Sequence, residues 1–340
     1  MRSIVRHLAL IESKEPPARG IDGARRRAMM DLNRSNSLWK LRTRALALGR
    51  RTLVMGVVNI TPDSFSDGGA FLDPEAAVAH ALRLLDEGAD LLDLGAESTR
   101  PGSRAGRAAG IDPVPEVSAK EEQARLMPVL RGILRQRPEV VISVDTYKAS
   151  TARAALGAGA QIVNDVSGFS WELELALVCA EYRCGVVLMH TRGRPDEWHA
   201  QQKLAPDTLI ETVRAGLATS LSLADAAGIL REAIVLDPGY GFGKKFDENY
   251  VLLARQAGLL TLGRPLLAGV SRKSFLGHTL AALYDGETSP VESRETASIA
   301  AMVTAILHGA SIVRVHNVRP AVEAARIADA VLAAEAEKRA

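Results

Sequence analysis

Short apolar runs recur along this chain, and each ends at a polar residue before a longer segment with helical spacing of apolar residues begins. The first run covers residues 53–58 and ends at Asn59. The runs predict eight buried strands at 53–58, 91–94, 140–144, 162–163, 186–189, 234–236, 266–270 and 312–315. The helical segments between them include 74–87, 119–137, 171–182, 208–227 and 295–307.

Alternating strands and helices imply parallel pairing, because a parallel crossover needs a connection about as long as a helix. Eight such units close a barrel, so we predict an α/β fold of the TIM (β/α)8 type. An open doubly wound sheet is the alternative, but its first turn would carry a GxGxxG motif, whereas the first turn here reads NITPDSF. Residues 38–52 alternate polar and apolar positions and predict an N-terminal hairpin.

Residues 1–37 have a different character, with three consecutive arginines at Arg25, Arg26 and Arg27 and little apolar periodicity. We predict a disordered or loosely docked basic extension here, followed by a single barrel domain over 38–340. A basic arm that contacts RNA or lipid, or a start codon at Met29 or Met30, stays open. No apolar signal core and no apolar run of about 18 residues is present, so neither a secretion signal nor a membrane partner is expected.

Composition narrows the function classes. The chain has 340 residues and a formal net charge of +2, which gives no reason to expect a nucleic-acid partner. Cys179 and Cys184 are too few for a metal site and are interpreted as small core residues in a reducing compartment. A cytoplasmic protein that acts on small molecules is therefore expected.

The barrel prediction brings distant polar residues together, because the carboxyl ends of all strands open onto one face. The residues expected to meet there are Asn59, Asp145, Asn164, Asp237, Lys273 and His316. Each alone has an ordinary explanation: an Asp after a strand is usually a helix cap, a Lys is usually solvated, and a His can be structural. Their joint occurrence at strand ends favours a functional site.

Two sets of residues with different chemistry can be distinguished at this end. The heterocycle set offers acceptors, an amide and one cation, and consists of Asp145, Asn164, Asp237 and Lys273. It suits a flat ring with a donor–acceptor edge, because a carboxylate accepts two parallel N–H bonds from such an edge. The anion set suits a phosphate or pyrophosphate with a hard cation on a carboxamide oxygen, and consists of Asn59, Arg100, Arg314 and His316.

Seven motifs occur in order along the chain: MGVVNITPDSFSDGG (55–69), DLGAESTRPG (93–102), SVDTYK (143–148), NDVSG (164–168), DPGYGFGK (237–244), SRKSFLG (271–277) and RVHNV (314–318). With them, the sequence from residue 53 to about 334 resembles the dihydropteroate synthase family. The resemblance implies a TIM barrel, usually a homodimer, that uses magnesium. It also implies condensation of 6-hydroxymethyl-7,8-dihydropterin pyrophosphate with 4-aminobenzoate, giving 7,8-dihydropteroate and pyrophosphate.

The resemblance also implies a role for each site residue. The heterocycle set would hold the pterin, with Lys273 also counted as catalytic. Asn59 would bind the magnesium ion, while Arg100, Arg314 and His316 would hold the pyrophosphate. The residues implied to surround 4-aminobenzoate are Phe65, Thr99, Pro101, Phe242 and Ser274. Its carboxylate would lie near the start of the helix after Lys273, where free N–H groups favour an anion.

The expected mechanism is a largely dissociative substitution, because a neutral aniline nitrogen needs no strong general base. Loops 60–71 and 97–116 would close over the substrates to exclude water. A pterin-binding methyltransferase is the alternative enzyme, although it has little use for Arg314, His316 or the STRPG motif. The other alternative is a catalytically silent paralogue, which would be expected to have lost residues that this chain retains.

Three departures from the family pattern concern loops more than chemistry. The second loop is long over 103–122, Asn317 stands where the family typically has Asp, and Ala96 stands where Gly is common. None of these removes a group that the mechanism needs. Ordinary sensitivity to sulfonamides is expected, because the residues around Phe65 and Pro101 match the family.

Overall fold

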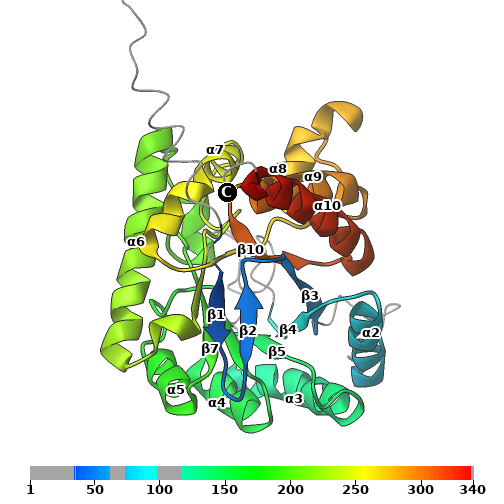
Figure 1. Ribbon diagram of the computed structural model, residues 1–340, viewed down its shortest axis with the longest axis vertical. Coiled ribbons are helices and arrows are strands. Elements are labelled where there is room, and N and C mark those ends of the chain that lie inside the picture. The colour runs from blue at the N-terminus through cyan, green and yellow to red at the C-terminus, as the bar shows by residue number, and fades with distance from the viewer. Residues whose placement is uncertain (1–33, 35, 62–72, 98–116, 338–340) are drawn as a thin grey trace, which may run out of the picture. The chain divides into compact units, whose positions relative to one another are not determined.

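Eight parallel strands form a closed barrel in the order β10-β3-β4-β5-β6-β7-β8-β9, as the computed structural model shows for residues 34, 36–61, 73–97 and 117–337 (Figure 1). The strands are β3 (Leu53–Asn59), β4 (Leu91–Gly95), β5 (Ile142–Asp145), β6 (Ile162–Asp165), β7 (Gly185–Met189), β8 (Ile234–Asp237), β9 (Leu266–Ala268) and β10 (Ala310–Val315). The predicted TIM barrel is thus confirmed, and the open sheet is excluded.

Helices follow the strands and surround the barrel (Figure 1). They are α2 (Pro74–Asp86), α3 (Ala119–Gln136), α4 (Ala149–Gly157), α5 (Glu174–Tyr182), α6 (Pro206–Ala227), α7 (Glu248–Arg255), α8 (Ser274–Thr279), α9 (Glu295–Leu307) and α10 (Val318–Glu337). Short 3-10 helices occur at η1 (Pro195–Ala200), η2 (Arg231–Ala233), η3 (Gln256–Leu262), η4 (Ala281–Leu283) and η5 (Glu292–Arg294). None of the helices in the described ranges is long and apolar enough to cross a membrane.

The predicted hairpin is confirmed as two antiparallel strands, β1 (Ser37–Lys40) and β2 (Ala45–Leu48). Trp39 is 1% exposed and packs in one apolar cluster with inward side chains of the barrel strands, such as Met55 and Val235. The indole Nε1 of Trp39 donates a hydrogen bond to the carbonyl oxygen of Ala233 at 2.8 Å. The hairpin therefore closes the amino-terminal end of the barrel, opposite the end where the strands deliver their last residues.

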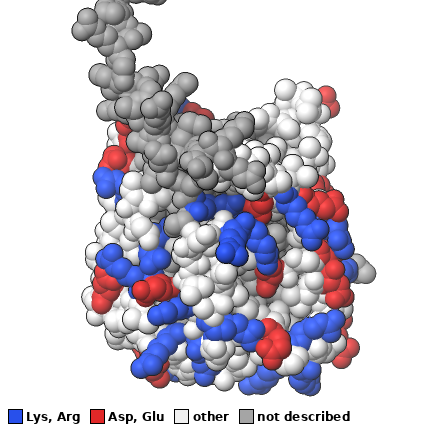
Figure 2. Space-filling view, viewed as in Figure 1, with Lys and Arg blue, Asp and Glu red and all other residues white. Residues whose placement is uncertain are grey.

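The seam between the last strand and the first is tied by Asp329 of α10. Its carboxylate accepts hydrogen bonds from the Thr52 backbone N–H at 2.8 Å and from Arg34 at 2.7 Å. Arg34 also donates to the carbonyl oxygen of Ala310, the first residue of β10, at 3.2 Å. These bonds place Arg34 with the barrel. Basic and acidic side chains are interspersed on the hairpin face (Figure 2), where one ion pair joins Arg51 and Asp90.

Candidate active site

Polar side chains gather at the carboxyl ends of the strands. Asn59, Asp145 and Asp237 are the last residues of β3, β5 and β8, and Asn164 is paired with Asp145 in the parallel register of β5 and β6. His316 follows β10 directly, and Lys273 precedes α8. The structure therefore brings six residues, separated by up to 257 positions in sequence, to one end of one barrel.

Asp93 joins three elements of the barrel at this end. Its Oδ2 accepts a hydrogen bond from Asn164 Nδ2 at 2.9 Å and one from Arg314 Nε at 2.6 Å. A second guanidinium nitrogen of Arg314, Nη2, donates to Asp145 Oδ2 at 2.8 Å. Asp93 itself has no exposed surface, and its other oxygen has no hydrogen-bond partner among the described residues. Residues of β4, β5, β6 and β10 are thus linked by one charged network.

Arg314 is consequently a direct neighbour of the heterocycle set, although its sequence position predicted a place in the anion set. Asp93 was not among the predicted site residues. The signal for it was a carboxylate inside the otherwise apolar run LLDLG, because an unpaired charge is rarely placed in a buried strand.

Burial changes the acidity of the carboxyl groups in this network. It raises the pKa of Asp145 to about 7, where the Arg314 guanidinium lowers it and the nearby Asp93 raises it. Burial also raises the pKa of Asp237, although a hydrogen bond from the Gly239 N–H and the charge of Lys273 act in the opposite direction. Burial lowers the pKa of Arg314, but the carboxylates of Asp93 and Asp145 outweigh it and raise the pKa. Asp145 can therefore change its charge near neutral pH.

Lys273 and Phe242 meet over the mouth of the barrel. The Lys273 ammonium lies 3.9 Å from the centroid of the Phe242 ring, and that ring makes an edge contact with Trp198 at 5.2 Å. Ser274 is the first residue of α8, and among the described residues no side chain caps the first turn of this helix. The predicted neighbours Lys273, Phe242 and Ser274 thus belong to one corner of the site.

His316 and Asn59 are the described members of the anion set besides Arg314. Ser271 Oγ lies 3.0 Å from His316 Nδ1 and fixes the ring, a contact that the sequence did not reveal. Asn59 is partly exposed at the end of β3. The other predicted residues, Phe65, Thr99, Arg100 and Pro101, lie outside the described residues, as do most of loops 60–71 and 97–116.

The Asn59 carboxamide at the end of β3 offers an oxygen ligand of the kind that a hard cation accepts. In the part of the chain that the structure describes, no group of three or more His, Cys, Asp or Glu could hold a metal ion. Magnesium commonly keeps several waters and takes one or two protein oxygens together with substrate phosphates. The carboxamide oxygen of Asn59 fits such a single protein contact.

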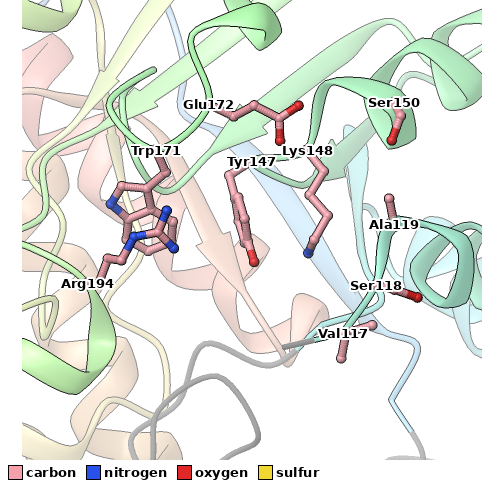
Figure 3. A pocket seen from close by; sticks show the side chains of 9 residues that line it. All are labelled: Val117, Ser118, Ala119, Tyr147, Lys148, Ser150, Trp171, Glu172 and Arg194. Carbon is pink, nitrogen blue, oxygen red and sulfur yellow. The ribbon is translucent and has the colours of Figure 1, made fainter. Parts of the chain in front are cut away.

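A cavity of about 340 Å³ is lined in part by residues that follow β5 (Figure 3). Tyr147 and Trp171 line it and make an edge-to-face contact at 5.1 Å, with the Arg194 guanidinium 5.0 Å from the Trp171 ring. Lys148, also in its lining, pairs with Glu97 and with Glu122. None of the predicted site residues is among the described residues that line this cavity.

Comparison with known proteins gives one consistent result. The sequence pattern of a family described as pterin binding enzyme matches residues 55–316. The chain is 43% identical to dihydropteroate synthase of Mycobacterium leprae over 279 residues, which cover 82% of this chain and 93% of that protein. It is 41% identical to dihydropteroate synthase of Synechocystis sp. over 284 residues, or 83% and 91% of the two chains.

The fold comparison agrees with the sequence comparison. A crystal structure of Xanthomonas albilineans dihydropteroate synthase with 4-aminobenzoic acid is similar with a TM-score of 0.75 and 39% sequence identity. The similarity covers 88% of this chain and 99% of that chain.

Proposed function

The chain belongs to the family of pterin-binding enzymes and acts as a dihydropteroate synthase, and on this premise we propose which of its residues carry the reaction. The enzyme joins 6-hydroxymethyl-7,8-dihydropterin pyrophosphate to 4-aminobenzoate and releases pyrophosphate. The observation that carries the assignment of residues is the partly buried network of Asp93, Asp145, Asn164 and Arg314 at the carboxyl end of the barrel.

We propose that the pterin binds against this network. Asp145 and Asp237 would accept N–H bonds from the ring edge, and Asn164 can both donate and accept. A planar guanidinium stacks well on flat rings, so Arg314, held by two carboxylates, would form one face of the binding site. Lys273 would bind the pterin and, with Phe242 and Ser274, contact the 4-aminobenzoate as well.

The pyrophosphate would lie towards β3 and β10. His316, held by Ser271, would donate to its oxygens, and Arg100 is proposed to add a second cation. Asn59 would hold a magnesium ion there, and such an ion, when bound, neutralises charge on phosphate oxygens. Preorganised donors of this kind stabilise the negative charge that develops on a leaving group.

The reaction would proceed by loosening the C–O bond before the new C–N bond forms. Positive charge on the exocyclic carbon can spread into the electron-rich dihydropterin, and the carboxylates of Asp145 and Asp237 lie beside that ring. The amine attacks as the neutral base, so no side chain must remove its proton first.

The decisive experiment measures pyrophosphate release and dihydropteroate formation by the purified protein, with and without 4-aminobenzoate and magnesium. Release that depends on both is expected. Asp237→Asn should lower kcat/KM for the pterin substrate by about 100-fold, because hydrogen bonds to a charged group contribute up to about 3 kcal/mol.

Asp225→Asn is the matched control, because Asp225 lies on the outer face of α6, paired with Arg231 at 2.8 Å. It should leave kcat/KM unchanged. Binding of the pterin substrate without release of pyrophosphate would instead support a silent pterin-binding protein. Binding of methyltetrahydrofolate in its place would support a methyltransferase.

We also propose a homodimer in the cytoplasm as the working form. Cys179 and Cys184 are both buried free thiols, which agrees with a reducing compartment. Ile327 and Val331, four residues apart on α10, are 69% and 45% exposed and offer an apolar contact face. The molecular mass of the protein in solution tests this oligomeric state.

A further inference from the structure

Lys244 is a buried lysine at the end of the turn that follows β8. Its side-chain nitrogen donates to three backbone carbonyl oxygens, those of Gly239 at 2.7 Å, His190 at 3.2 Å and Phe242 at 3.2 Å. An ammonium group has three N–H donors and no acceptor, so three carbonyls match it completely. Lys244 is therefore a cross-link between the turn after β8 and the end of β7.

Two of the three carbonyls, those of Gly239 and Phe242, belong to the segment that contacts the proposed site. The N–H of Gly239 donates to Asp237 Oδ1 at 2.7 Å, so one peptide segment bonds both Asp237 and Lys244. The backbone of Phe242 bonds Lys244, while its ring lies against the Lys273 ammonium. Lys244 therefore hydrogen-bonds directly to Phe242, a proposed aminobenzoate contact. It also hydrogen-bonds to Gly239, whose N–H group holds Asp237, a proposed pterin contact.

The turn over residues 239–243 is rich in glycine, so its backbone is conformationally free unless other residues constrain it. Gly239, Gly241 and Gly243 all have positive φ values, of 72°, 83° and 68°. Glycine loses more conformational freedom on folding than any other residue, so three of them within five positions need an external constraint. A Cβ on Gly239 would lie 1.9 Å from the carbonyl oxygen of His190, which shows how closely the turn packs on the end of β7.

We propose that Lys244 is a positioning residue of the active site, whose ammonium group fixes the turn over residues 239–243 and thereby sets the orientation of the Asp237 carboxylate and the Phe242 ring. The inference rests on the proposed roles of Asp237 and Phe242. Lys244 does not touch substrate itself.

On balance, the electrostatic surroundings disfavour the charge of Lys244. Burial lowers the pKa of Lys244 to about 7, while the carboxylate of Asp237 raises it. Arg192 and Lys273 lower the pKa further, and Glu248 raises it. Burying a charged ammonium group costs desolvation free energy, and the hydrogen bonds to the three carbonyls offset that cost. A neutral amine has two N–H groups and could not donate to all three carbonyls.

The first test compares Lys244→Met with Lys245→Met. Lys245 is the matched control, because the hydrogen bond that its side chain makes to the described residues is an exposed one, to the carbonyl oxygen of His199 at 3.1 Å. We expect Lys244→Met to raise KM for 4-aminobenzoate and the Kd for the dihydropterin substrate about tenfold each, whereas Lys245→Met changes either less than twofold. Lys244→Gln, which keeps two N–H donors, should fall between and serves as the variant if Lys244→Met does not fold.

A double-mutant cycle separates positioning from general stability. Phe242→Ala removes the ring that Lys244 orients, so adding Lys244→Met to it should raise KM for 4-aminobenzoate much less than in the wild type. Fully additive effects would overturn the inference. So would a Lys244 variant with a lowered melting temperature but unchanged KM and Kd values where it is folded.

These outcomes also distinguish failure of the inference from failure of the proposed function. If the wild type released no pyrophosphate, the synthase mechanism would fail. Calorimetric Kd values for the dihydropterin substrate would still compare the wild type with the Lys244 variants. An unchanged Kd in the Lys244 variants would then reject the positioning role independently.

Discussion

Asp145 lies between a cation that favours its charge and surroundings that oppose it. Arg314 donates to its carboxylate at 2.8 Å, but burial and the neighbouring Asp93 raise its pKa to about 7. The three groups form a network in which the protonation of one carboxyl group affects how firmly Arg314 is held. The protonation state of Asp145 should therefore change with pH near neutrality.

This shift predicts the pH dependence of pterin binding. The ionised carboxylate accepts N–H bonds that the protonated form accepts poorly, so affinity should rise as pH increases through about 7 and level off above it. Calorimetric titrations of the pterin substrate between about pH 6 and 8 test this. Asp145→Asn should bind more weakly and lose much of the rise; an equal slope in the variant would show that another group titrates.

Single strand-end residues could be predicted from sequence, but their partners could not. Asn59, Asp145 and Asp237 end apolar runs, and barrel closure requires the ends of such runs to converge. Nothing in one sequence shows that Asp93 meets Arg314, because they are 221 positions apart. Which side chain faces which across a barrel depends on stagger between strands, and the apolar pattern does not report it.

Among the elements, the N-terminal hairpin was predictable from the sequence, but its position on the barrel was not. Alternation along residues 38–52 predicted two short strands, and β1 and β2 are present. The pattern shows that one face is apolar but not what covers it. Local turn geometry was also hidden: the helix predicted from residue 171 begins at Glu174, after a turn in which Gly168 and Phe169 have positive φ values.

The hairpin should support stability without influencing chemistry. Trp39→Ala would remove a buried indole and its bond to Ala233, so it should lower the free energy of unfolding by about 3 to 5 kcal/mol. Urea unfolding measures the loss, and kcat at a temperature where the variant is folded should stay unchanged, because Trp39 closes the opposite end of the barrel.

Leu38→Ala is the matched control for this prediction. Leu38 is the neighbouring residue of β1 and is 57% exposed, so its truncation should change the unfolding free energy by no more than about 0.5 kcal/mol. A fall in kcat for Trp39→Ala without a loss of stability would show that the hairpin acts on the active site.

For the whole molecule, the repeat of strand and helix was enough to predict closure, since eight parallel units have one common solution. How the barrel is closed was not predictable. The seam pairs Ile312 with Leu53 and is held by Arg34 and Asp329, residues 295 positions apart in the chain. The local spacing of apolar residues does not predict such long-range hydrogen bonds.

Exposed apolar side chains on the outer helices bear on whether two barrels associate. A stable homodimer buries on the order of 1,600 Å² with an apolar centre. The exposed side chains of Ile327 and Val331 on α10 are candidates for such a centre. A charge placed there would have to be desolvated on association, so Ile327→Asp should shift the mass in solution from two chains towards one.

Light scattering after size exclusion, at several protein concentrations, measures this shift. Leu177→Asp on α5 is the matched control, because Leu177 is similarly exposed at 61% and lies on a different helix. It should leave the dimer intact. A wild-type protein that has the mass of one chain at micromolar concentration would reject the dimer, whereas a dimer that survives Ile327→Asp would place the contact on another surface.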